Sequence, residues 1–496
     1  MAKNEYIVAI EIGSSKISGA IGIHTTAGIR ILAYANEPSN TYVSKGVIRN
    51  VDEASNSLNS LINRLESQLE DVHIKKAYIS FSCMSIHSVS SKITKKFDSY
   101  TKITQDIINE MFAENEQTFI IPKGYKKLQV VPQEYKLEGD STTSPIGIPT
   151  QSITCNYLNI IVKEQYIQQQ KESFEAAKTD IVDSFNTACL EAEYILNEEE
   201  LNCGAAIVSI GAETTTVAVY SGKVLRKLIV IPLGSANITK DICNEQINTP
   251  EAEKIKIFKG YGSSADKDCP LQPEKIDNII SGRMSEILKN TQYQIENSGY
   301  NIGRIVFTGG GSKLINLSKI IEENIPNYKY RIASDIQPPY NKDNADFITT
   351  GSITPALFVL LSNGNTNCCE EEVLAPANAA VATDIFDSNT NTQETGKSPK
   401  DDKPNGEQNS GDEKKSTETT TVETTKEITT TKSQETETET AEDKKTSTQE
   451  TKENNKNTDK KSKGSYVNKV IGFFDDWFNG EVISDESDNK NEEKSL

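Results

Sequence analysis

Two short polar turns carry residue types that can bind phosphate. The first follows the apolar run Ile7–Ile12 and offers backbone N–H groups, two hydroxyls and a cation, on Gly13, Ser14, Ser15 and Lys16. Such groups form anion-binding concavities where they line a turn. Glu11, just before this turn, could hold a magnesium ion through water. Taken alone, a Gly-Ser hairpin is more often only a turn.

A second turn repeats the arrangement later in the chain. The run SIGAETTT places Gly211 and Thr214 where the first turn has Gly13 and Lys16. Each turn joins two apolar stretches that are typical of strands. Two such turns in one chain favour phosphate binding more than either turn does alone, because phosphates held between paired hairpins need this duplication.

Two further groups of residues could contact a nucleotide. TGGGSK places Gly309, Gly310 and Gly311 between a strand and a helix, where bare backbone allows close approach and a helix N-terminus favours an anion. A tight strand-to-helix connection explains the same glycines equally well. Glu253 and Lys256 stand one helical turn apart and so share a face, although a solvated ion pair on an exposed helix is the simpler interpretation.

The elements that position the two turns are themselves duplicated. Ile7–Gly22 predicts a strand, the first turn and a second strand, and Ile29–Ala35 predicts a third strand. Asp52 then opens a helix whose apolar residues recur at three- and four-residue spacing. Gly204–Gly234 repeats the order of strand, polar turn, strand, glycine turn and strand. This duplication predicts two similar halves whose turns face one cleft.

The segments between and after the repeats are predicted as follows. Cys83–Val162 is predicted as an inserted module of short strands with one helix around Gln105–Phe112. A helix is predicted from Gln165 through Ala176 and Phe185. After the second repeat, helices are predicted at Glu251–Gly260 and Glu274–Ser298, followed by the strand that precedes the three glycines.

Composition excludes several functions. The net charge of −19 argues against a nucleic-acid partner, since phosphate backbones select basic surfaces. Eight scattered cysteines without ligand spacing indicate free thiols in a reducing cytosol, and three histidines offer little material for a metal site. The N-terminus does not have the pattern of a signal peptide, and no apolar run approaches the roughly 18 residues that would span a bilayer.

The C-terminal part has two regions of opposite character. Ser388–Ser465 contains neither Leu nor any aromatic residue, so it cannot bury enough apolar surface to fold, and we expect a disordered linker. Residues 466–480 predict a helix with one broad apolar face, formed by Val467, Val470, Ile471, Phe474, Trp477 and Phe478.

An interfacial position in a membrane suits this terminal helix, because it is too short to span one. Docking on the body or in a partner groove is the alternative. It is favoured by Asp475 and Asp476, because lipid-binding helices usually carry a basic polar face. Lys460, Lys461 and Lys463, just upstream, could supply attraction to anionic lipid.

The order of these motifs resembles a known superfamily. EIGSSK, SIGAETT, IPLGSANITKDI, EAEKIK and TGGGSK follow one another as in the actin, sugar-kinase and heat-shock ATPases. VVPQEYKLEG with SPIGI, and SKGVIRNVDEA near the first hairpin, are similar to segments of the bacterial cell-division FtsA family, the former within its inserted subdomain 1C. The resemblance covers about residues 5–386 and resumes at the C-terminal helix.

The resemblance implies an α/β fold of the actin-like, two-lobed ATPase type. Lobe 1 would comprise residues 5–82 and 163–202, the inserted α/β subdomain 83–162, and lobe 2 residues 203–386, with 237–303 as its subdomain 2B. ATP with Mg²⁺ would lie between the lobes. The phosphates would meet the two turns, the ribose or adenine would meet Glu253 and Lys256, and the adenosine would lie beside Gly309–Gly311; Gly234 belongs to the same nucleotide-binding set.

The sequence departs from the family pattern at the second turn. Family members commonly begin this turn with an Asp, whereas this chain has Ser209, and Ala212 and Glu213 replace two glycines. An acid at Ser209 would position magnesium and the attacking water. We therefore expect nucleotide binding with little or no turnover. Glu213 could partly substitute for that acid, or could repel phosphate.

The resemblance also implies a cellular role. The protein would form head-to-tail filaments with itself at the division site, on the cytoplasmic side of the cell membrane. There it would bind anionic lipid and tie FtsZ, together with other division proteins, to the membrane. The site for the FtsZ tail would lie at about Asn237–Ser298. The alternatives are an actin-like protein of type IV pilus assembly, which shares the inserted module, and an active kinase or ATPase of the same superfamily.

Overall fold

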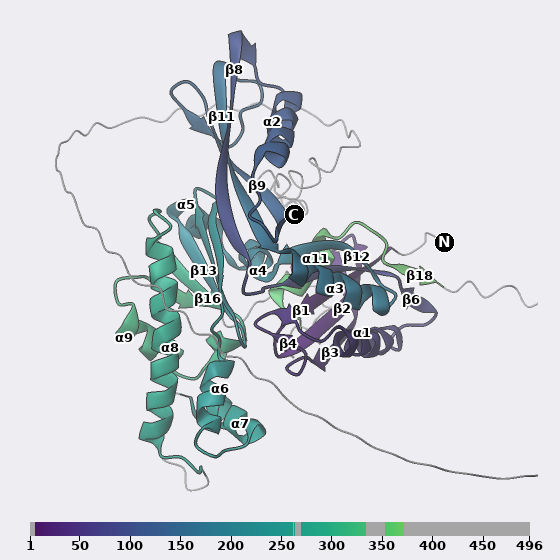
Figure 1. Cartoon of the computed structure of the whole chain (residues 1–496), viewed down its shortest axis with the longest axis vertical. Helices are drawn as coiled ribbons and strands as arrows, with labels where there is room; N and C mark the ends of the chain where they lie inside the picture. The colour runs from purple at the N-terminus through teal and green to yellow at the C-terminus, as the bar shows by residue number, and fades with distance from the viewer. Residues whose placement is uncertain (1–4, 261, 263–268, 334–352, 372–496) are drawn as a thin grey trace, which may run out of the picture. The chain divides into compact units, whose positions relative to one another are not determined.

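The computed structural model describes residues 5–260, 262, 269–333 and 353–371 (Figure 1). The predicted linker and the terminal amphipathic helix lie outside these residues. Among the described residues, no helix is both long and apolar enough to cross a bilayer.

The first repeat forms a five-stranded sheet, in which β1 and most of β2 are buried on both faces, whereas the edge strand β3 alternates between buried and more exposed residues. β1 pairs antiparallel with β2 and parallel with β7, so the predicted hairpin and the KAYISFS strand share one sheet. The order is β12–β7–β1–β2–β3, with bounds Asp180–Asn186, Lys76–Phe81, Tyr6–Ile12, Lys16–Thr25 and Gly28–Pro38.

The second repeat has the same topology within a nine-stranded sheet. β13 pairs antiparallel with β14 and parallel with β16, as β1 does with β2 and β7. The order is β10–β9–β11–β8–β15–β14–β13–β16–β17, with bounds Ser141–Thr142, Tyr125–Lys136, Pro149–Lys163, His87–Lys102, Val224–Ile231, Thr215–Ser221, Ala205–Ile210, Arg304–Thr308 and Tyr330–Ile332. The duplication predicted from sequence is therefore confirmed at the level of strand pairing.

Burial on both faces explains why β13 is an almost unbroken apolar run. Ala205 and Ile207 belong to a core that also contains β1 and β7, whereas Ala206, Val208 and Ile210 belong to the core that includes α8 and α9. Side chains of a strand alternate between its faces, so a strand between two cores needs apolar residues at every position.

The segment between the repeats differs from the prediction in strand length. β8, β9 and β11 have 16, 12 and 15 residues, so the expected short strands are wrong. Their alternating polar and apolar residues pair over long registers, and α2 (Gln105–Thr118) packs on one face. Buried Asn115 and Asn159 hydrogen-bond to each other at 3.0 Å beneath α2. β8 also joins β15, which continues the nine-stranded sheet.

The helix predicted through Phe185 is also wrong. α3 spans Glu164–Ala176 and ends two residues before Lys178, whose φ is +55°. Phe185 lies in β12, which pairs in parallel with β7. The periodicity of a short apolar run does not distinguish a strand from a helix. Here the segment forms a strand because it pairs with the neighbouring β7.

Three further predicted helices are found at the expected positions. Asn50 caps α1 (Val51–Glu66), and its side chain accepts from the N–H of Glu53. The helices predicted at Glu251–Gly260 and Glu274–Ser298 are confirmed as α7 (Thr249–Lys259) and α8 (Pro273–Glu296). The remaining elements are α4 Thr187–Ile195, α5 Glu198–Cys203, α6 Ala236–Cys243, α9 Leu317–Asn324, α11 Pro355–Asn363, the 3₁₀ turn η1 Gly310–Lys313, and the short strands β4 Val43–Ser44, β5 Val47–Ile48, β6 Val72–Ile74 and β18 Cys369–Glu371.

Candidate functional site

The two polar turns close in the same way. The N–H of Gly13 donates to the carbonyl of Lys16 at 3.1 Å, and the N–H of Gly211 donates to the carbonyl of Thr214 at 2.8 Å. A Cβ on Gly13 would lie 2.8 Å from the Lys16 carbonyl oxygen, and one on Gly211 would lie 3.0 Å from that of Thr214. Each turn therefore needs glycine at its first position.

A serine that follows the third strand braces each turn. The Ser39 hydroxyl donates to the carbonyl of Gly13 at 2.6 Å, and the Ser235 hydroxyl donates to that of Gly211 at 3.1 Å. Neither serine was predicted. The signal was present in the sequence, because both follow the third strand of their repeat. Gly234 allows the second brace, since a Cβ there would lie 2.5 Å from the carbonyl oxygen of Ala212.

Two backbone amides connect the turns. The N–H of Gly46 donates to the hydroxyl of Ser14 at 2.8 Å, and the adjacent N–H of Lys45 donates to the carboxylate of Glu213 at 2.8 Å. Both residues have positive φ, +52° at Lys45 and +70° at Gly46. A Cβ on Gly46 would lie 1.9 Å from the carbonyl oxygen of Ser82, so only glycine fits. The structure thus brings the two predicted turns to one short segment.

Glu213 is neutralised within the protein. Its carboxylate pairs with Lys240 and accepts the Lys45 N–H. Burial raises the pKa of Glu213, but the hydrogen bonds from Lys240 and Lys45 outweigh it, so the net pKa is below its ordinary value. Glu213 is therefore ionised and already partnered, which reduces its repulsion of a phosphate.

A second carboxylate at the site was missed by the sequence analysis. Glu191, on α4, is only 5% exposed, and its Oε2 atom has no hydrogen-bond partner among the residues that the structure describes. Burial raises its pKa to about 8; a hydrogen bond with Ser209 opposes this rise, and the nearby charge of Glu11 adds to it. Glu191 thus adjoins both Glu11 and the position where the family acid is missing. Nothing in its local sequence marks it, because α4 reads as an ordinary helix.

Glu11 lies on β1 and has a partner from the far end of the described chain. The hydroxyl of Thr354, the N-cap residue of α11, donates to its carboxylate. Burial raises the pKa of Glu11, whereas Thr354 and the charge of Lys16 lower it less strongly. Two carboxyl groups with raised pKa values therefore adjoin the polar turns.

Two of the three glycines pack against Ile210, the residue just before the second turn. A Cβ on Gly309, whose φ is +84°, would lie 2.6 Å from the carbonyl oxygen of Ile210, and one on Gly311 would lie 2.4 Å from its side chain. Among the described residues, no atom lies within 4 Å of the same position on Gly310, so Gly310 faces open space there. The expected helix does not follow directly: a 3₁₀ turn comes next, and α9 begins only at Leu317. Gly310 is therefore the glycine at which a ligand can approach.

Glu253 and Lys256 form part of a partly buried network. The ammonium group of Lys256, only 8% exposed, donates to the Glu253 carboxylate at 2.7 Å and to the hydroxyl of Thr239 at 3.0 Å. Thr239 donates in turn to Glu253 at 2.6 Å. The ion pair favoured by sequence is present, but it is solvated only at Glu253, whose side chain is 43% exposed, and not at Lys256. Gly260, which follows α7, packs closely against Ile315, a few residues after the three glycines: a Cβ on Gly260 would lie 2.4 Å from the Cβ of Ile315.

ATP and Mg²⁺ fit these residues. The orphaned Oε2 of Glu191 can take a hydrogen bond from a metal-bound water, as magnesium usually keeps several waters. The open space at Gly310 admits a group near the second turn. Lys16 is exposed at the end of the first turn and is available to an anion.

Family models and known proteins give a consistent comparison. The model described as cell division protein FtsA matches residues 206–350, and that described as the SHS2 domain inserted in FtsA matches residues 84–161. A cell division protein FtsA of Porphyromonas gingivalis is 26% identical over 348 residues, which cover 65% of this chain and 72% of that protein. The FtsA of Bacillus subtilis is 25% identical over 355 residues, covering 67% and 80%.

A solved structure gives a comparison of fold alone. The PilM–PilN type IV pilus biogenesis complex contains a chain with a TM-score of 0.52 and 15% identity, covering 72% of this chain and 96% of that one. At this identity the similarity concerns the arrangement of helices and strands. It does not extend to partners.

Proposed function

Since this chain belongs to the FtsA family of cell-division proteins, we propose that it is an ATP-binding adaptor that polymerises on the inner membrane face and anchors FtsZ filaments there. Its fold is the actin-like ATPase fold of the α/β class. The observation that carries nucleotide binding is the pair of identically closed turns, both tied to Lys45–Gly46.

The proposed nucleotide site follows from this geometry. Phosphates bind the backbone of the two turns and Lys16, and Gly310 faces the adenosine. Glu11 and Glu191 hold Mg²⁺ through its waters, with Glu191 supplying the carboxylate that Ser209 lacks. Residues 5–82 with 163–202 form lobe 1, residues 83–162 the inserted subdomain, and residues 203–386 lobe 2.

Turnover should be slow. The carboxyl group of Glu191 has a raised pKa, to about 8, so it is a poor fixed charge for holding magnesium and water before nucleotide binds. We expect ATP to bind and phosphate release to stay close to background. Steady release at ordinary enzyme rates, on the order of 1 per second or faster, would instead assign the chain to the active kinases or ATPases.

The proposed FtsZ contact lies on α7. Ile257 and Phe258 are 50% and 71% exposed, side by side within the region that the family resemblance implies. Adjacent exposed apolar side chains offer a docking surface for the apolar residues of a peptide tail. Tyr100, on β8, is similarly exposed at 67% and lies outside that region, so it provides a matched surface control.

The test is recruitment of FtsZ to anionic vesicles by the purified chain with ATP. The full chain should carry FtsZ to floating vesicles, and a chain ending at Gly464 should not. Ile257→Ser with Phe258→Ser should leave the chain on the vesicles but lose FtsZ, whereas Tyr100→Ser should keep both. Vesicle binding without any recruitment of FtsZ by the natural chain would favour the pilus-assembly alternative.

A further inference from the structure

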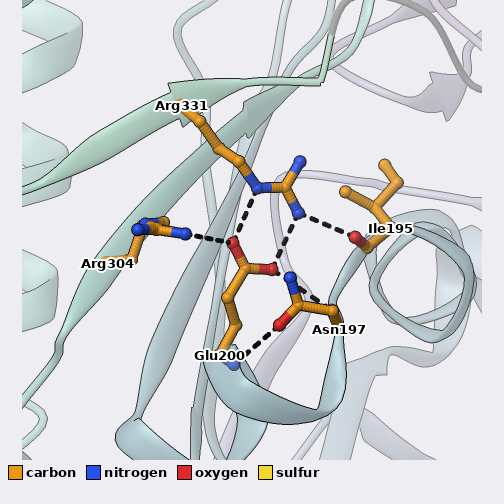
Figure 2. A network of polar contacts seen from close by, with 5 residues as sticks. All are labelled: Ile195, Asn197, Glu200, Arg304 and Arg331. Carbon is orange, nitrogen blue, oxygen red and sulfur yellow. Dashed lines mark hydrogen bonds and ion pairs between the residues drawn. The ribbon is translucent and has the colours of Figure 1, made fainter.

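A buried carboxylate connects three elements through ion pairs with two arginines. The side chain of Glu200, at the start of α5, is 2% exposed and accepts four hydrogen bonds (Figure 2). Arg331 on β17 donates two of them, at 2.6 and 2.7 Å. Arg304 on β16 donates one at 3.3 Å, and the N–H of Asn197 donates one at 3.2 Å.

Arg331 makes one contact that Arg304 does not. Its Nη2 atom also donates to the carbonyl of Ile195 at 2.8 Å (Figure 2). Ile195 is the last residue of α4, and Glu191 lies one helical turn before it. The carbonyls at a helix C-terminus lack partners within the helix and carry partial negative charge, so a guanidinium group both satisfies and stabilises this end.

We propose that Arg331 is a positioning residue for the nucleotide site: through Glu200 and the Ile195 carbonyl it fixes α4, and with it Glu191, against β16 and β17. The inference rests on the proposed nucleotide site and adds to it a residue that touches neither phosphate nor metal. β16 leads directly to Gly309, so one network sets the position of both Glu191 and the glycine loop.

The chemistry of the network suits a rigid connection. A planar guanidinium group binds the carboxylate with two parallel hydrogen bonds, which fix its direction as well as its distance. Burial raises the pKa of Glu200, but Arg331, the Asn197 amide and Arg304 outweigh it and hold the net pKa below its ordinary value. The carboxylate is thus ionised, and all its partners are engaged.

Arg331→Lys is the variant that separates positioning from stability. Lysine can keep an ion pair with Glu200 but cannot span both Glu200 and the Ile195 carbonyl. Arg304→Gln is the matched control, because it weakens a hydrogen bond to the same Glu200 carboxylate but leaves the contact between Arg331 and α4 in place. Affinity for a fluorescent ATP analogue is measured by titration with Mg²⁺ and with EDTA, at a temperature where thermal unfolding shows each variant folded.

The inference predicts a magnesium-specific loss. Arg331→Lys should weaken binding about tenfold with Mg²⁺ and little with EDTA, as changes behind a metal site commonly do. Arg304→Gln should weaken neither. In a double-mutant cycle, the losses of ATP affinity caused by Arg331→Lys and Glu191→Gln should be strongly non-additive, since both changes act through the carboxylate of Glu191.

Two results would overturn the inference alone: natural affinity in Arg331→Lys, or an equal loss with Mg²⁺ and with EDTA. Failure of the natural chain to bind ATP would overturn the proposed nucleotide site together with it. If Arg331→Lys does not fold, Glu200→Gln is measured in the same way. Its uncharged amide keeps one acceptor oxygen and has a donor NH₂ group in place of the other. This variant is expected to show the same magnesium-specific loss of ATP affinity.

Discussion

At the scale of single residues, two buried carboxyl groups set the character of the site. Within the described part of the chain, Glu191 has one oxygen without a hydrogen-bond partner, and the carboxylate of its neighbour Glu11 accepts a hydrogen bond from Thr354. Burial raises the pKa of both. Unfavourable burial of this kind is often found at functional sites, because a ligand supplies the missing interaction.

Glu191→Gln should stabilise the nucleotide-free protein at high pH. An acid with a raised pKa binds its proton more tightly when folded, so the free energy of unfolding falls as pH rises from about 4.5, the ordinary value, to about 8. Each pH unit in this window changes stability by at most ~1.4 kcal/mol. Denaturant unfolding should show a gain of a few kcal/mol at pH 8.5 and almost none near pH 4.5.

Glu198→Gln is the control for this prediction, because its side chain is 84% exposed and outside the site. It should show no gain that grows with pH. A Glu191→Gln variant whose stability difference is the same at both pH values would contradict the assignment of a buried, protonated Glu191.

At the scale of elements, glycine conformations determine how closely the strands and turns approach. Gly309 needs a positive φ and sits against Ile210, which precedes the second turn. A Cβ on Gly310, the next residue, would have no atom of the described residues within 4 Å. Adjacent glycines therefore serve different purposes, one in packing and one in leaving space.

Gly309→Ala and Gly310→Ala should differ sharply. The first forces a Cβ to 2.6 Å from a backbone oxygen and should destabilise the protein by about 2 kcal/mol or more. The second should change stability by less than about 0.5 kcal/mol and should weaken ATP binding. Thermal unfolding and nucleotide titration measure both effects. Equal stability of the two variants would refute the packing role of Gly309. Unchanged ATP affinity in Gly310→Ala would refute the proposal that Gly310 faces the ligand.

At the scale of the whole molecule, a duplicated body is combined with an acidic tail that ends in an apolar segment. The duplication gives two phosphate turns, and the inserted module extends the second sheet through β8 and β15. The C-terminal segment lies outside the described residues. A short amphipathic anchor binds weakly by itself, so stable attachment requires many anchors, and filaments of the body would supply them.

Replacing Phe474 and Trp477 by Glu should release the protein from anionic vesicles. The expected affinity is mainly hydrophobic, so raising salt should weaken binding only moderately. Asn468→Glu with Asn479→Glu adds the same charge at polar positions and should retain most of the binding. Flotation measures all three chains; unchanged flotation of the first variant would exclude the anchor.

The sequence by itself determined the local structure and the repeat. Strand alternation, polar turns and helix spacing are properties of neighbouring residues, so Ile7–Ala35, Gly204–Gly234 and the helices α1, α2, α7 and α8 were predicted correctly. The long strands of the inserted module and the strand at Phe185 were missed, because their form depends on pairing with segments distant in sequence.

Only the tertiary structure decided which residues meet at the site. Lys45 and Gly46 connect turns that are far apart in the chain, and Glu191 reaches Ser209 and Glu11 from a helix with no local signal. Arg331 likewise acquires its position only through contacts with Glu200 and Ile195. Local pattern determines which face of an element is apolar, whereas packing between distant elements determines which polar groups are brought together.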